Sequence, residues 1–160
     1  MTVEPCNGSP QQQFSIDSEN GSITQLSSGL MVTIQDCTVM PPGSRGAGTA
    51  VVLLPSGHGG GKCGGMNQLW KFHSNGTITS RMTSAPCLDV YAHVNPVQAH
   101  FCVADKTGKP GPPESEAWKI EPSENSESVT IRWGLPTFSK CLQGPTANPF
   151  REAARCGKNN

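Results

Sequence analysis

The chain has 160 residues, enough for one domain with a single core. It is 34% hydrophobic with a mean hydropathy of -0.38, and its 18 glycines and 14 prolines interrupt the sequence too often for long helices, so many short strands joined by turns are expected. Charged residues make up 15% and the formal net charge is +0, which argues against a disordered charged polymer and against a nucleic-acid partner, and no apolar stretch approaches the roughly 20 residues that span a membrane.

A short strand pattern recurs three times along the chain. Each copy reads polar, any, aromatic, any, apolar, which is the alternation typical of a half-buried strand. The copies are residues 12–16, 68–72 and 116–120. A polar turn and a second short strand follow each copy, and Ile23, Ile78 and Ile131 fall at corresponding places. The repeat predicts three units of about four short strands each.

Two further strands complete each predicted unit. The first of them lies near a cysteine in residues 87–90 and 141–144 and has no cysteine in residues 30–33. A variable loop then leads to the last strand of the unit. These last strands are expected at residues 49–54, 96–102 and 149–156.

The unit boundaries are out of phase with the ends of the chain. The chain opens in the middle of a repeat, and residues 156–160 parallel residues 63–67, which precede the second copy of the pattern. We therefore expect a single domain with units at approximately 15–72, 73–120, and 121–160 completed by 1–14. Either the fold is circularly permuted or a longer polypeptide continues beyond Asn160, and both can hold.

Seven cysteines are scattered along the chain, and none forms a C-x-x-C pair, which argues against zinc and thioredoxin-type redox sites. Disulfides in a loop-rich chain indicate an oxidising compartment, so the protein is expected to be secreted, extracellular or luminal. Cys87 and Cys102 have the same separation as Cys141 and Cys156, and both pairs join corresponding strands. Those two bridges are predicted, together with Cys37–Cys63, and Cys6 is left over.

Three sequons fit the same compartment and make Asn7, Asn20 and Asn75 candidates for glycosylation. The alternative for Asn20 and Asn75 is structural, because Asn-Gly also favours a type I′ hairpin turn.

Three motifs together resemble a known family. Gln68-Leu69-Trp70 matches Q-x-W, Asn75-Gly76-Thr77-Ile78 matches N-G-T-I, and Cys87-Leu88-Asp89-Val90 matches C-L-D-V of the ricin-B-type lectins and the related carbohydrate-binding modules of glycoside hydrolases. The resemblance covers nearly the whole chain. It implies an all-β fold, a β-trefoil of three four-stranded units with pseudo-threefold symmetry, with the Q-x-W aromatics in the core. Two copies depart from the motif, since Phe14 replaces Trp and Glu116 replaces Gln.

The resemblance also implies a sugar-binding site in the second unit. Asp89 takes the place of the carboxylate that accepts hydrogen bonds from two sugar hydroxyls, and His100 takes the place of the stacking aromatic. Gln98, Ser115 and Glu116 supply further polar positions. An open, shallow cleft beside Asp89 is expected. The structural alternative is that Asp89 caps a turn or bonds a neighbouring strand.

The resemblance implies a binding module. An enzyme has little support from the sequence, because it contains no nucleophile elbow, zincin motif or Cys–His arrangement. The expected partners are glycans of the galactose or N-acetylgalactosamine type, with no cofactor, metal ion, nucleic acid or membrane span. The chain is expected to belong to a larger polypeptide, such as a secreted glycoside hydrolase. Two alternatives remain: a structural or adhesion trefoil with degenerate sugar sites, and a trefoil protease inhibitor.

Overall fold

The computed structural model describes residues 1–37, 48–58, 60–90, 96–102, 116–123, 128–134 and 140–145. These residues form an all-β fold with almost no helix. The strands are β1 (Thr2–Pro5), β2 (Phe14–Ile16), β3 (Ile23–Gln25), β4 (Met31–Ile34), β5 (Thr49–Leu54), β6 (Trp70–Phe72), β7 (Ile78–Ser80), β8 (Cys87–Asp89), β9 (Gln98–His100), β10 (Trp118–Pro122), β11 (Val129–Trp133) and β12 (Lys140–Gln143). The helical turns are α1 (Gly60–Cys63), η1 (Pro10–Gln12), η2 (Gln35–Cys37) and η3 (Met66–Gln68).

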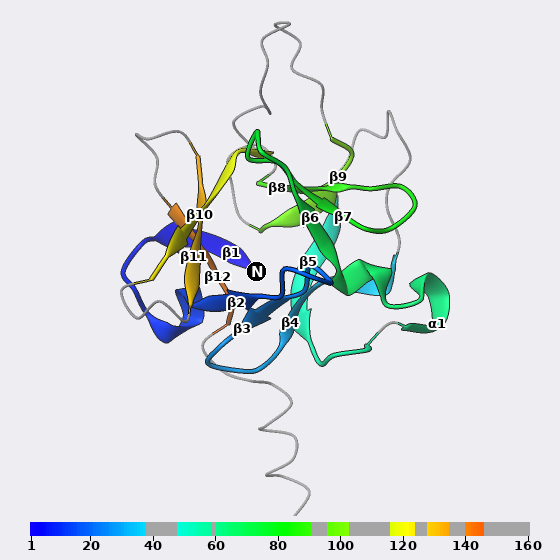
Figure 1. The fold of residues 1–160 in the computed structure, drawn as a ribbon, viewed down its shortest axis with the longest axis horizontal. Coiled ribbons are helices and arrows are strands. Elements are labelled where there is room, and N and C mark those ends of the chain that lie inside the picture. Colours follow the sequence, from blue (N-terminus) through cyan, green and yellow to red (C-terminus); the bar gives the residue numbers. More distant parts are fainter. Residues whose placement is uncertain are drawn as a thin grey trace, which may run out of the picture.

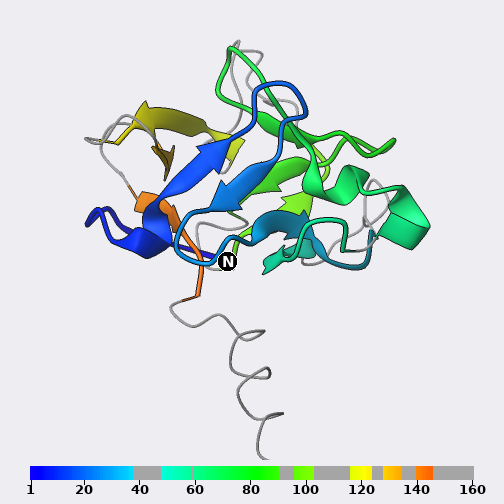
Figure 2. The ribbon, with the colours of Figure 1, turned by 60° about the horizontal axis from the view of Figure 1, so that its bottom comes forward.

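The strands join into one curled antiparallel sheet of 12 strands (Figures 1 and 2). Its order is β1-β12-β11-β2-β3-β4-β5-β9-β8-β7-β6, with β10 paired to β11 beside this path. Among the described residues, no helix is both long and apolar enough to cross a membrane.

The strands fall into three groups with the same internal pairing. Group 1 holds β2 to β5, group 2 holds β6 to β9, and group 3 holds β10 to β12 followed by β1. In every group the first strand pairs with the second, the second with the third and the third with the fourth. The first strand of the chain is therefore the partner of its last strand, with Val3 opposite Leu142.

The N-terminal segment supplies the fourth strand of group 3. β1 pairs with β12 over four residue pairs, from Thr2 opposite Gln143 to Pro5 opposite Lys140. The strand expected at residues 149–156 lies outside the described part of the chain.

Three backbone hydrogen bonds link the fourth strands of the groups in a closed ring. The N-terminal ammonium of Met1 donates to Val51 O at 2.8 Å, the amide of Val51 donates to Val97 O at 3.4 Å, and the amide of Val97 donates to Met1 O at 3.0 Å. The chain begins near the centre of Figure 1 for this reason. Burial lowers the pKa of the Met1 ammonium, because the charged form loses solvation there.

The aromatics of the repeated pattern lie in the core. Phe14 and Trp70 are 0% exposed and Trp118 is 6% exposed. The indole of Trp70 donates to Val32 O at 3.0 Å, and the indole of Trp118 donates to Leu88 O at 2.8 Å. Each buried N–H therefore has a carbonyl partner on the third strand of the preceding group.

The two Asn-Gly hairpins connect neighbouring groups. Only the glycines have positive φ, +80° at Gly21 and +90° at Gly76, so neither turn is the type I′ turn that was the alternative for these sequons. A Cβ on Gly21 would lie 2.0 Å from Trp70 O, and one on Gly76 would lie 2.9 Å from Trp118 O. Glycine is needed because each hairpin tip accepts the backbone amide of the next tryptophan, at 2.9 Å in both cases.

Candidate functional site

Three of the five predicted sugar-binding residues lie on two paired strands of group 2, and a fourth, Glu116, has a carboxylate oxygen close to the sulfurs of Cys87 and Cys102. Asp89 at the end of β8 is opposite Gln98 at the start of β9, and His100 at the end of β9 is opposite Cys87. Side chains of directly opposed residues lie on the same face of a sheet, so Asp89 and Gln98 are neighbours. Glu116 comes two residues before β10. Ser115 lies outside the described residues.

These side chains are more buried than expected for residues that line an open cleft. Asp89 is 3% exposed, Gln98 6% and Glu116 1%, whereas His100 is half-buried. Asp89 therefore does not face solvent within the described part of the chain, and the buried Oε1 atom of Gln98 has no hydrogen-bond partner there. Residues 91–95 and 103–115, which flank this region in sequence, are outside that part.

The site repeats at three corresponding places, which we call corners. Each corner joins the third strand of a group, the residue that ends or follows its fourth strand, and the polar residue two positions before the aromatic of the next group. The first corner contains Thr33, Pro55 and Gln68, the second contains Asp89, Phe101 and Glu116, and the third contains Gln143, Pro5 and Gln12. The correspondence follows from strand register, since Thr33, Asp89 and Gln143 are opposite Val52, Gln98 and Thr2.

In the first corner, the buried amide of Gln68 ties three segments together. Its Nε2 atom donates to Thr33 Oγ1 at 3.0 Å and to Pro55 O at 2.8 Å. Its Oε1 atom accepts the backbone amide of Gly57 at 2.8 Å.

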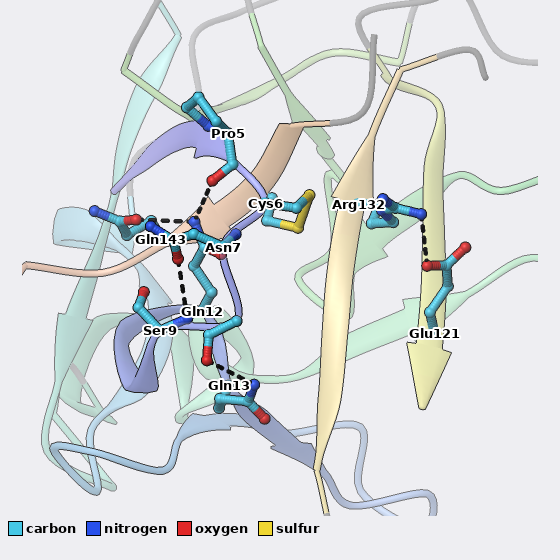
Figure 3. Close-up of a disulfide and its surroundings, with 11 residues drawn as sticks. Pro5, Cys6, Asn7, Ser9, Gln12, Gln13, Glu121, Arg132 and Gln143 are labelled. Carbon is cyan, nitrogen blue, oxygen red and sulfur yellow. Dashed lines mark hydrogen bonds and ion pairs between the residues drawn. A yellow bond between two sulfur atoms is a disulfide. The ribbon is translucent and has the colours of Figure 1, made fainter. Parts of the chain in front are cut away.

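The third corner has the same arrangement (Figure 3). Nε2 of Gln12 donates to Pro5 O at 2.9 Å and to Gln143 Oε1 at 3.0 Å, and its Oε1 atom accepts the amide of Asn7 at 2.9 Å. In both corners the glutamine therefore works as a donor and an acceptor at once.

The second corner differs in chemistry, because carboxyl groups occupy two of its positions. Glu116 stands where the other corners have glutamine, and Asp89 stands where they have Thr33 or Gln143. A carboxylate only accepts hydrogen bonds, so the amide's two donated bonds cannot be reproduced unless one acid carries a proton or a donor from elsewhere enters. This corner is thus rich in buried acceptors.

The described residues contain three disulfides, and two of them are predicted ones, Cys87–Cys102 in the second corner and Cys37–Cys63. The predicted bridge from Cys141 to Cys156 is wrong, because Cys141 bonds to Cys6. The reason is the pairing of β1 with β12, which places Glu4 opposite Cys141 and so brings Cys6, the residue after β1, to the same strand. Cys156 lies outside the described residues.

Sequence reasoning missed Cys6 as a structural residue, although a signal for it exists. Pro5 and Cys6 precede Gln12 much as Pro55 and Ser56 precede Gln68, so Cys6 matches the end of a fourth strand. The Cys6–Cys141 bridge consequently relates to its two strands as Cys87–Cys102 relates to β8 and β9.

The glycosylation candidates Asn7, Asn20 and Asn75 are all exposed. In each sequon the Asn Oδ1 atom accepts the amide of the Ser or Thr two residues on, at 2.9, 2.7 and 3.1 Å respectively. Asn20 also donates from Nδ2, the nitrogen that a glycan would modify, to a carboxylate oxygen of Asp17.

A small charged cluster lies on the β10–β11 hairpin, away from these corners in sequence. Glu121 forms ion pairs of 2.8 Å with both Lys119 and Arg132. The hydrogen bond from Lys119, together with the charges of both cations, lowers the pKa of Glu121 although burial acts in the opposite direction. Because these side chains are partly exposed, we interpret the cluster as surface ion pairs that contribute little to stability.

No protein-family model, curated protein or solved structure matches this chain.

Proposed function

We propose that the chain is a carbohydrate-binding module with a ricin-B-like β-trefoil fold. Two structural features support the trefoil: the same strand pairing occurs in three groups, and Met1, Val51 and Val97 close a ring of three hydrogen bonds at corresponding positions. A pseudo-threefold axis through this ring accounts for both. Three disulfides suit an extracellular or luminal protein.

The second corner is the proposed sugar site, and its gathering of two buried carboxyl groups and the buried amide of Gln98 is the observation that carries the proposal. Asp89 and Glu116 are acceptor-only when ionised, and Gln98 Oε1 lacks a partner within the described residues. A sugar presents several hydroxyl donors on one rigid ring, and charge-assisted bonds from them to a carboxylate are strong. The half-buried His100 supplies the flank from which the sugar enters.

Galactose and N-acetylgalactosamine are the proposed ligands, on the resemblance of the C-L-D-V strand. A single site of this kind binds weakly, and avidity comes from several modules or several glycans. The module acts as part of a larger secreted polypeptide that supplies any catalytic activity.

Retention on a galactose matrix, followed by a glycan array, tests the proposal. The chain should be retained and released by free galactose, and Asp89→Asn, which keeps the side-chain volume, should weaken binding by roughly tenfold or more, or about 1.4 kcal/mol. Gln143→Ala changes the corresponding position of the third corner and is the matched control, expected to bind as the unchanged chain does. Equal retention of Asp89→Asn would contradict the assignment of the site.

The second candidate is a structural or adhesion module whose sugar sites have decayed. The burial of Asp89 and Glu116 favours it, because a sugar needs access to these carboxylates. A folded chain that binds no glycan on the array would support this candidate and exclude the lectin.

A further inference from the structure

The second corner brings together three atoms that can bind a metal ion. The sulfur atoms of Cys87 and Cys102 and a carboxylate oxygen of Glu116 all lie within 4.8 Å of one another. Cys87 and Glu116 are buried, whereas Cys102 is exposed. The two sulfurs form a disulfide, so they cannot act as thiolate ligands in the oxidised chain.

We propose that reduction of the Cys87–Cys102 disulfide converts the second corner into a binding site for a zinc-like divalent cation. Two thiolates and one carboxylate are a ligand set that zinc accepts, and three protein ligands leave the fourth tetrahedral position for water. Zinc–sulfur bonds are about 2.3 Å long. After reduction, the two sulfurs therefore need only move apart until they occupy two neighbouring positions of a tetrahedron around the metal ion.

The redox step is an ordinary thiol–disulfide exchange. A small dithiol attacks the exposed sulfur of Cys102, the Cys87–Cys102 bond breaks, and the dithiol leaves as its own cyclic disulfide. Two electrons and two protons pass to the protein, which then carries two thiols. Metal binding displaces both thiol protons into solvent, and re-oxidation by a small disulfide releases the metal.

The other comparable bridge makes the inference specific. Cys6–Cys141 lies beside Gln12, whose Oε1 and Nε2 atoms are already engaged by Asn7, Pro5 and Gln143. An amide carries no charge and is a poor zinc ligand. Among the described residues, only the second corner combines its disulfide with a buried carboxylate.

Cobalt(II) titration of the full chain tests this proposal, after mild reduction that opens the bridge of the exposed Cys102 and leaves Cys6–Cys141 intact. Thiolate ligation produces an intense sulfur-to-cobalt charge-transfer absorption, and zinc added afterwards should displace the cobalt. The reduced chain should show this absorption and the oxidised chain should not. Glu116→Gln places the residue of the other two corners at this position, so the variant should fold normally. Its affinity for cobalt should fall by roughly tenfold or more.

Two double variants locate the ligands. Cys87→Ser with Cys102→Ser should abolish the absorption, whereas Cys6→Ser with Cys141→Ser should retain it. Cobalt affinity of Glu116→Gln equal to that of the unchanged chain would overturn the proposal, because thiols of an unfolded or rearranged chain bind metal without Glu116. Absorption that persists without Cys87 and Cys102, or that never forms in the reduced chain, would overturn it as well.

Discussion

The second and third corners have the same backbone arrangement and opposite side-chain chemistry. In both, a disulfide joins the third strand of a group to a cysteine one or two residues beyond its fourth strand, as Cys87–Cys102 and Cys6–Cys141. In the third corner Gln12 satisfies its neighbours as donor and acceptor, whereas in the second corner Glu116 can only accept when ionised. The same scaffold thus holds a buried amide that donates and accepts in one place and buried carboxyl groups in another.

The largest predicted difference between the corners comes from the lengths of chain that their disulfides close. Sequence separation is 135 residues for Cys6–Cys141 and 15 for Cys87–Cys102. By loop-closure entropy, replacing both cysteines of a bridge with alanine should cost about 5 kcal/mol at the first and about 3 kcal/mol at the second. Denaturant unfolding of the two double variants measures both losses. A smaller loss at Cys6–Cys141 would show that the chain ends already stay together without the bridge.

Exchanging the residues of the two corners should give a smaller and asymmetric effect. Gln12→Glu removes two donated bonds and leaves Pro5 O and Gln143 Oε1 without them, so we expect a loss of about 2 kcal/mol or more. Glu116→Gln places the glutamine of the other two corners at this position, so its stability should equal or exceed that of the unchanged chain.

Thermal or denaturant unfolding at neutral pH compares the exchanged pair. Equal losses for Gln12→Glu and Glu116→Gln would mean that the carboxyl group at Glu116 stabilises the second corner as much as the amide at Gln12 stabilises the third. In that case the second corner has the structural role of the other two.

The repeated strand pattern made much of the fold predictable. Trp70 and Trp118 lie in the core because the alternation around them fits a half-buried strand, and Asn75-Gly76 forms a hairpin because the turn needs a glycine. The Cys87–Cys102 bridge was predictable because both residues lie within one group. These features depend on residues close together in sequence.

Features that depend on distant segments were harder to predict. Cys141 has two candidates, the nearby Cys156 and the remote Cys6, and residue spacing alone favours the nearby one over the true partner. The burial of Asp89 depends on what packs around β8 and β9 in space, whereas the C-L-D-V motif shows only which residue is present. The three ligand atoms at Cys87, Cys102 and Glu116 converge without any local spacing motif.

The smallest predicted effect concerns the N-terminus. The donor at Met1 is a charged ammonium, whereas the donor at the corresponding Val97 is an uncharged backbone amide. Burial lowers the pKa of the Met1 ammonium below its usual 8.0, so the unfolded chain binds this proton more tightly than the folded chain. Stability should therefore rise with pH from the folded pKa up to about pH 8 and stay level above it, as far as this group is concerned. Acetylation keeps the N–H that donates to Val51 O and removes the charge, so it should flatten that part of the profile. Unfolding free energies of the two forms across this range isolate Met1 from the histidines, which are common to both. Parallel profiles would show that the ammonium stays well solvated in the folded chain and that the ring at Met1, Val51 and Val97 is open to water.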